Sequence, residues 1–490
     1  MSIPRSEQET DSASPEPRIG KCPECFKSTF HEISFVIMAT LAMATDSLVT
    51  GAMIIVTSSI GRDLDMTQAQ ITWIRISLTA GAFQLPLGQL SGLLDRKPFF
   101  IAGLIGFSAS SLILGFAQNA FWLNVLAGFL GLFSTAIVPP AAGILGAAYG
   151  EPSKRKNWVF ACFSAGTPVG FGVGSIVMGV AGFFFFSIIW TSLAVVACWA
   201  VAGWIEAYEA GSFRKRLRVG LGKFDGLGTA LTVLGVGLLT TGLTLGPADG
   251  WKTAHVISML IVRSFLLIAF VFWKNHCRNP LMPLHIWKDR VFSLLNPISI
   301  LGVIAMISSN FWLALFLQGL QHRSALGVAV DLLAQVISAI ISNIVAANIL
   351  HRVNNSLIMV FGAAMYVLAS ILLAVQDPHA VYWALIFPSL LTNIMGLDCN
   401  SMYVMQSLPA HQQSLAAGIF NMFIRLGTII GLRISTAVYS SVQKRVGESE
   451  GDTFQPFRAA FYVSVGFAVL ACVFVPFLRV GTQGGAVKRE

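Results

Sequence analysis

The amino-acid sequence predicts an all-α membrane protein with 14 transmembrane helices and with both termini in the cytosol. Hydrophobic residues make up 55% of the 490-residue chain, charged residues make up 11%, and the mean hydropathy is +0.72. Soluble domains carry about 25% charged residues, so a soluble core cannot absorb this much apolar surface. Two further observations support the prediction: a series of long apolar runs, and an uneven distribution of lysine and arginine between them.

The apolar runs have the length of a transmembrane helix, which needs about 20 residues to cross the hydrocarbon layer. Each run is expected to be helical because every backbone polar group inside a membrane must be bonded within its own segment. In chain order, the predicted spans are 33–57, 72–94, 98–117, 121–147, 157–181, 184–204, 225–245, 256–273, 291–317, 327–350, 356–375, 381–407, 414–441 and 459–479.

Lysine and arginine concentrate in alternate connecting segments. With a cytosolic N-terminus, 22 of the 32 basic residues fall in cytosolic segments and 6 fall in outside loops. Cytoplasmic loops of membrane proteins carry an excess of basic residues, so this split predicts cytosolic termini and an even number of spans. The net charge of +9 therefore reflects orientation in the bilayer, and we expect no nucleic-acid partner.

Polar stretches after the sixth and eighth spans divide the chain into a 6 + 2 + 6 arrangement. We expect a disordered cytosolic tail (1–30), a six-helix bundle (31–205), cytosolic linkers with two inserted helices (206–290), a second six-helix bundle (291–480) and a short cytosolic tail (481–490). Two bundles around a site at the membrane midplane are typical of secondary transporters.

Other functional classes lack support in the sequence. A primary pump would need a nucleotide-binding motif such as GxxxxGK[ST], which the sequence does not contain. Cys22 and Cys25 supply two ligands where a structural zinc needs four. We therefore predict neither an enzyme nor a bound metal or cofactor, and we expect the partners to be a small-molecule substrate, protons and the lipid bilayer, with the chain acting as a monomer.

The segment GQLSGLLDRK (88–97) joins the second and third predicted spans. It resembles the loop pattern G-x-L-a-D-x-x-G-R-K of the major facilitator superfamily, in which Gly88, Leu90, Arg96 and Lys97 match. The acid of the pattern falls on Gly92, and Asp95 stands three residues later. The resemblance implies a cytosolic latch in which Asp95 substitutes for the usual acid or the latch is weakened. The alternative is a short basic turn that only fixes topology.

Three further segments extend the resemblance along the chain: residues 50–83, residues 396–421 and SAGTPVGFGVG (164–174). They are similar to the fourteen-span drug:H⁺ antiporters, and within them to the fungal subgroup that contains aminotriazole-resistance and low-affinity ammonium transporters. The resemblance implies a major facilitator fold. In the fourth span, Asn124 occupies the position of the arginine that the family associates with proton coupling. Because asparagine holds no charge, either coupling runs through other groups or the protein is not a conventional antiporter.

Ionisable residues at membrane depth are functional candidates by default. Asp46 lies midway along the first span with no cation predicted at its depth, which favours a proton carrier; the alternative is a neutral Asp46 bonded to Ser or Thr neighbours. Asp398 and Arg425 lie at matching depths in sequential spans, which predicts a pair that acts as a switch or as a static buried ion pair. Arg75 is expected to line the outer mouth or to reach headgroup water. No role follows from the sequence for Arg263.

A second group of candidates is polar or aromatic and lies at positions that the family uses for its central cavity. Such side chains would suit an amphipathic organic substrate, and ordinary helix packing is the alternative for each. With Arg75 and Asn124, the predicted cavity residues are Asn310, Phe311, Trp312, Gln318, Asn393 and Asn400.

The fifth span contains glycines at intervals of four. Gly166, Gly170 and Gly174 share one helix face, which lets a neighbouring helix approach closely. Pro168 removes a backbone hydrogen bond and favours a bend. Gly172 lies off this face and is expected to line the cavity. We interpret the segment as a gating element between the halves; a packing stripe without a gating role is the alternative.

Together these features predict proton-coupled export of small organic compounds, such as drugs, toxins or secondary metabolites, by alternating access. A facilitator or importer of a small polar solute such as ammonium or borate is one alternative, and a non-transporting receptor or scaffold on a transporter fold is another. The plasma membrane is the expected location, with the vacuolar membrane as the alternative.

Overall fold

The computed structural model describes residues 29–63, 81–93, 96–149, 155–176, 222, 224–250, 253–277, 287–288, 290–349, 353–377, 382–393, 413–449 and 454–478. Within these ranges the regular secondary structure is helical. In chain order the helices are α1 (Thr29–Asp63), α3 (Gly81–Leu93), α4 (Arg96–Leu114), α5 (Ala120–Ala148), an unlabelled helix (Arg155–Ile176), α8 (Gly226–Asp249), α9 (Ala254–His276), α10 (Arg290–Gly319), α11 (Ala325–Asp331), α12 (Leu333–Ile349), α13 (Asn355–Val375), α14 (Ile386–Asn393), α16 (Gln413–Ser449), α17 (Gln455–Phe474) and the 3₁₀ turn η3 (Val475–Phe477).

The described helices follow the predicted spans. Ten of them are long and apolar enough to cross a membrane, and every predicted span except 184–204 overlaps a described helix. The span 184–204 lies outside the described residues, so the number of fourteen spans stays a prediction, as does the side on which the termini lie. Polar caps mark several of the helix starts: Asn119 accepts a hydrogen bond from the backbone of Trp122, and Ser324 accepts one from Gly327.

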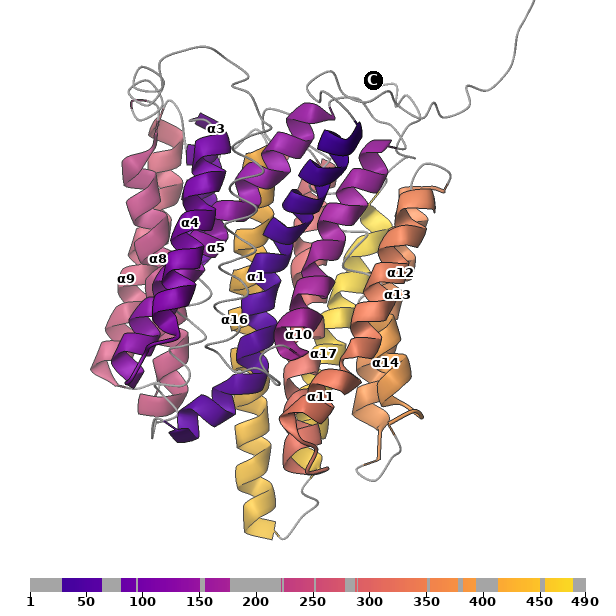
Figure 1. Ribbon diagram of the computed structural model, residues 1–490. Helices are drawn as coiled ribbons and strands as arrows, with labels where there is room; N and C mark the ends of the chain where they lie inside the picture. The colour runs from indigo at the N-terminus through magenta and orange to yellow at the C-terminus, as the bar shows by residue number, and fades with distance from the viewer. Residues whose placement is uncertain are drawn as a thin grey trace, which may run out of the picture.

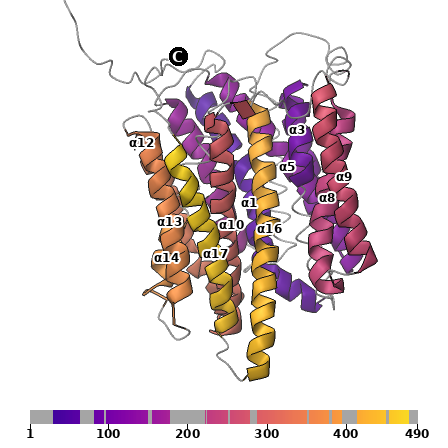
Figure 2. The same cartoon turned by 180° about the vertical axis from the view of Figure 1, so that it is seen from behind.

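The helices run side by side in one bundle (Figure 1). α8 and α9 lie at one edge, α12, α13 and α14 lie at the opposite edge, and α1, α10, α16 and α17 lie between them in both views (Figure 2). α8 packs mainly against α9 and makes smaller contacts with α3 and α16. This peripheral position is compatible with an inserted pair of helices, while the predicted domain boundaries remain predictions.

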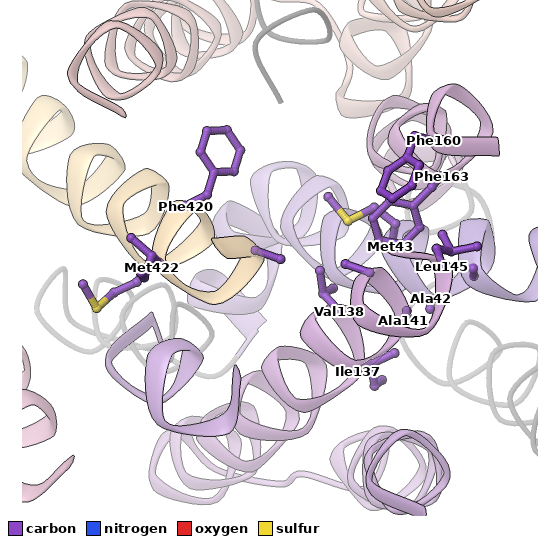
Figure 3. Packing of buried hydrophobic residues seen from close by; sticks show 14 of the residues in the cluster. Ala42, Met43, Ile137, Val138, Ala141, Leu145, Phe160, Phe163, Phe420 and Met422 are labelled. Atoms are coloured by element: carbon purple, nitrogen blue, oxygen red, sulfur yellow. The ribbon is translucent and has the colours of Figure 1, made fainter. Parts of the chain in front are cut away.

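An apolar core joins α1, α5 and the Arg155–Ile176 helix to α16. Figure 3 shows Met43 of α1, Val138 of α5 and Phe163 of the Arg155–Ile176 helix gathered in this core, with Phe420 projecting from α16. Burial of a large apolar side chain contributes roughly 1.5–3 kcal/mol in water-based transfer scales. Inside a bilayer, where lipid is as apolar as these side chains, close packing supplies much of the specificity instead.

The glycine stripe of the fifth span packs directly on α1. A Cβ built on Gly170 would lie 2.7 Å from the Cα of Ala44, and one built on Gly174 would lie 2.9 Å from the Cα of Leu48. A Cβ on Gly166 would lie 3.0 Å from the Cβ of Met43. The predicted close approach of a neighbouring helix is therefore confirmed, and that neighbour is α1. The gating role stays a prediction.

Gly172 faces a different neighbour. A Cβ built there would lie 2.7 Å from the Cγ2 of Val336 on α12. The side chain of Val336 therefore occupies the space beside Gly172. The expectation that Gly172 lines the central cavity stays a prediction. The Arg155–Ile176 helix therefore contacts α1 on one face and α12 on another.

Candidate functional site

Asp46 lies at the centre of the described polar contacts between early and late helices. Its carboxylate accepts a charge-assisted hydrogen bond from the guanidinium of Arg425, which comes from α16. The hydroxyl of Ser134, on α5, lies 3.1 Å from Asp46 Oδ1. Three helices that are distant in sequence therefore meet at one carboxylate.

The prediction that Asp46 has no matching cation is wrong. The sequence places Arg425 at the depth of Asp398, on the preceding span. Sequential helices are the natural first comparison, but here the cation comes from a helix 379 residues away along the chain. Asp398 lies outside the described residues, so its predicted pairing with Arg425 stays a prediction.

The ion pair is largely removed from solvent. The side chain of Asp46 is 18% exposed and that of Arg425 is 11% exposed. Both charges would be costly alone at membrane depth, whereas together they offset much of each other's desolvation. Removal of one partner therefore takes away the opposite charge that offsets the desolvation of the other.

Ser134 has two acceptors within reach and one proton to give. Its hydroxyl oxygen lies 3.1 Å from Asp46 Oδ1 and 3.0 Å from the carbonyl oxygen of Gly131. A hydroxyl donates one hydrogen bond at a time and rotates to suit its surroundings. Ser134 can therefore support the charged carboxylate and return to its own helix backbone when that charge is lost.

Several other predicted site residues lie outside the described residues: Arg75, Asp95, Asp398 and Asn400. Asn124 is described and lies near the start of α5. Ten residues of helix separate it from Ser134, which is about 15 Å along the axis. Its amide oxygen is buried without a hydrogen-bond partner among the described residues, and it is too far away to contact Asp46.

The aromatic candidates on α10 lie in a packed cluster. Trp312 is buried, stacks on Tyr439 with a ring-centroid distance of 4.3 Å, and donates from Nε1 to Ser435 at 2.9 Å. Phe311 makes an edge contact with Trp312 at 5.2 Å. For Trp312 this placement agrees with the packing alternative that the sequence left open.

The remaining cavity candidates are spread along the described helices. Asn310 is buried on α10, Gln318 lies near the end of α10, and Asn393 ends α14. Their role in substrate binding stays a prediction.

Residues of the predicted latch segment contact both an early helix, α5, and a late helix, α16. Arg96 donates to the carbonyl oxygen of Gly143 at 2.5 Å, which fastens the start of α4 to α5. Gly88 lies where α3 meets α16, because a Cβ built on Gly418 would lie 3.4 Å from the Cα of Gly88. Lys97 also has interactions with its surroundings. Asp95 is not described, so the latch itself stays a prediction.

Sequence reasoning missed a polar cluster at the start of α1. Buried Glu32 accepts a hydrogen bond from Tyr149 at 2.5 Å and forms an ion pair with Arg155, whose Nε lies 2.6 Å from Oε1. The sequence predicts no role for Glu32, although this acid directly precedes the first predicted span, 33–57. This cluster fixes the adjoining ends of α1, α5 and the Arg155–Ile176 helix.

A bundle of helices long and apolar enough to cross a membrane, with a buried ion pair between its early and late helices, is typical of a secondary membrane transporter. The chain belongs to the Major Facilitator Superfamily, whose family model matches residues 35–432. This match confirms the predicted family. It also confirms that the protein is a transporter and not an enzyme.

Several transporters align with this sequence over nearly its whole length. The low affinity ammonium transporter of Saccharomyces cerevisiae is 26% identical over 91% of this chain and 88% of its own length. The efflux pump terJ of Aspergillus terreus is 23% identical over 92% and 88%. The aminotriazole resistance protein of Saccharomyces cerevisiae is 22% identical over 92% and 84%.

Among solved structures, the human organic anion transporter MFSD10 (TETRAN) matches with a TM-score of 0.64. The match covers 91% of this chain and 99% of that chain at 13% identity. Identity at this level shows the fold alone. The predicted major facilitator fold is therefore confirmed.

Proposed function

We propose that the protein exports small organic compounds in exchange for protons, with Asp46 as the proton carrier and Arg425 as the cation that senses its charge. The observation that carries the proposal is the ion pair between α1 and α16, supported by Ser134 of α5. The pair joins helices that must separate when a two-part transporter rocks. Its state of protonation can therefore be linked to its conformation.

Protonation changes three contacts at once. A neutral Asp46 loses the Coulomb attraction that holds Arg425, and the hydroxyl of Ser134 is free to donate to Gly131 instead. α16 is then released from α1, and the two parts can rearrange. Loss of the proton on the other side of the membrane restores the carboxylate and re-forms the pair. Protons and substrate then move in opposite directions through alternate states.

The relatives support two choices of substrate. The efflux pump and the aminotriazole resistance protein favour export of an organic compound. The low affinity ammonium transporter favours the alternative, a facilitator of a small polar solute. Asn124 also favours the alternative, because it replaces an arginine that the family resemblance associates with coupling. Aminotriazole and ammonium are therefore the two probes that separate the proposals.

The proposal retains the fourteen-span topology with both termini cytosolic, a monomeric protein and a plasma-membrane location, with the vacuolar membrane as the alternative. Fluorescence microscopy of a tagged chain tests the location, and protease access to a tag at each end tests the orientation.

The deciding experiment is transport in proteoliposomes with an acidic lumen. We expect wild-type protein to accumulate aminotriazole and a protonophore to abolish the accumulation. Asp46→Asn should lose the gradient-driven accumulation at least tenfold while it still exchanges labelled for unlabelled aminotriazole, because the neutral side chain imitates one state of the cycle.

The matched control is Asp331→Asn, which changes an acid outside the Asp46–Arg425 pair. Asp331 Oδ2 lies 3.8 Å from Nη1 of Arg323. It should retain gradient-driven accumulation. The proposal is refuted if Asp46→Asn still accumulates aminotriazole in response to the pH gradient. Transport of ammonium without a pH gradient, together with no transport of aminotriazole, would establish the alternative.

A further inference from the structure

Gln84 on α3 carries a completely buried side-chain amide. Its exposure is 0%, and neither Nε2 nor Oε1 has a hydrogen-bond partner in the described part of the chain. Burial of an amide without a hydrogen-bond partner is unfavourable, because the lost hydration is not replaced. A glutamine at this position is therefore a cost to the fold as it stands, which points to a partner that binds during function.

The position of Gln84 places it on the contact between α3 and α16. A Cβ built on Gly418 of α16 would lie 3.1 Å from the carbonyl oxygen of Gln84 and 3.4 Å from the Cα of Gly88. These two helices come from opposite ends of the chain. A rocking motion that separates early from late helices would therefore expose this part of α3.

Helix direction relates Gln84 to the ion pair. α3 leads into α4 at the same end of the bundle where α16 begins, so α3 and α16 run in opposite directions. A helical side chain leans toward the N-terminus of its own helix. Gln84 therefore extends in the direction in which α16 passes from Gly418 through buried Asn421 to Arg425. Gly418 and Arg425 are seven residues apart, or about two helical turns, so they share one face of α16 and we expect the Gln84 amide on the same side of that helix as Arg425.

We propose that Gln84 binds substrate directly and selects compounds with a planar edge that offers a donor next to an acceptor, as in amides, amidines and aminoheterocycles. The amide of glutamine presents one acceptor and two donors, so it can form two parallel hydrogen bonds to such an edge. Ammonium would use Oε1 alone and leave Nε2 unpaired. This inference rests on the proposed export of organic compounds and specifies the substrate class.

The test measures equilibrium binding to the full-length protein in lipid nanodiscs. The readout is the rise in melting temperature on addition of aminotriazole or of ammonium. Aminotriazole carries an amino group beside a ring nitrogen and so has the required edge. Gln84→Leu removes both hydrogen bonds proposed to the substrate and keeps the approximate volume of the side chain. We expect it to melt at or above the wild-type temperature, because it removes an unsatisfied group, and to bind aminotriazole roughly tenfold more weakly.

Gln376 provides a matched control. It is also 0% exposed with both amide atoms unpartnered among the described residues, but it follows α13, which packs on α10, α14 and α17. Gln376→Leu should leave aminotriazole affinity unchanged. Gln84→Met repeats the test with an unbranched side chain if the leucine variant does not fold. The proposal is overturned if wild type shows no saturable stabilisation by aminotriazole, if the folded Gln84 variants keep wild-type affinity, or if Gln376→Leu loses affinity equally.

Binding without a pH gradient does not depend on proton coupling. If Gln84→Leu loses affinity while Asp46→Asn retains gradient-driven transport, the proposed coupling fails and the substrate assignment stands. If Gln84→Leu keeps its affinity while Asp46→Asn loses coupled transport, the coupling stands and the assignment of Gln84 fails.

Discussion

Substitution of Gly170 by alanine tests the contact that positions α1. The added Cβ would lie 2.7 Å from the Cα and 2.8 Å from the carbonyl carbon of Ala44, where ordinary van der Waals contacts begin at about 3.4 Å. Both atoms belong to the backbone, so no side-chain rotation relieves the clash, and α1 must shift by roughly half an ångström or more. Overpacking of this kind costs about 1–3 kcal/mol.

The shift has a functional consequence because Asp46 lies two residues after Ala44. We expect Gly170→Ala to lower the melting temperature of the purified protein by several degrees and to reduce aminotriazole transport more than aminotriazole binding. Gly170→Leu should abolish transport. The assays are thermal unfolding followed by tryptophan fluorescence, and transport in proteoliposomes normalised to folded protein.

Gly237 of α8 is the matched control for this substitution. It also lies inside a helix, but a Cβ built there meets nothing within 4 Å. Gly237→Ala should therefore be neutral or stabilising by about 0.5–1 kcal/mol, which is the usual gain of alanine over glycine in a helix. A Gly170→Ala variant that melts and transports like wild type would refute the argument from close packing.

Two further predictions concern polar contacts. Arg425→Gln removes the guanidinium that faces the Asp46 carboxylate and should destabilise the protein by about 3 kcal/mol, the lower end of the range for buried pairs because both side chains keep some exposure. Asp46→Asn together with Arg425→Gln should recover most of this loss in thermal unfolding. No recovery would show that the two charges do not depend on each other. Asp225→Ala removes the cap on the Gly228 backbone and the acceptor of Trp273 Nε1 at 2.9 Å, so it should cost about 1–2 kcal/mol and alter tryptophan fluorescence without loss of transport.

The sequence predicts the helices well because each span is specified locally. Apolar length and the backbone's need for internal hydrogen bonds determine where α4, α5, α10 and α13 lie, without reference to their neighbours. The glycine stripe is also local, and its spacing predicts a close neighbour correctly. The identity of that neighbour is not local, since nothing in residues 164–174 distinguishes α1 from any other apolar helix.

Pairing across the bundle is what the sequence leaves open. Asp46 and Arg425 are each visible as intramembrane charges, but their contact depends on how early and late helices are placed relative to each other. The same is true of Trp312, whose burial depends on Tyr439 and Ser435 of α16. Gln84 was missed for a related reason, since an amide in an apolar run gives no indication from sequence that it lacks a partner.

α1 is held on two sides by contacts of different kinds. The glycines of the Arg155–Ile176 helix fix the backbone of α1 through packing that does not depend on pH. Arg425 holds α1 through its attraction to the Asp46 carboxylate, which is lost when that carboxylate is protonated. Because the packing contact is independent of charge, release of Arg425 should leave α1 with the early helices and free α16. We therefore expect α1 and α16 to move apart during transport while α1 stays packed against the glycine stripe. This favours a role for Gly166, Gly170 and Gly174 in holding α1 within a rigid unit.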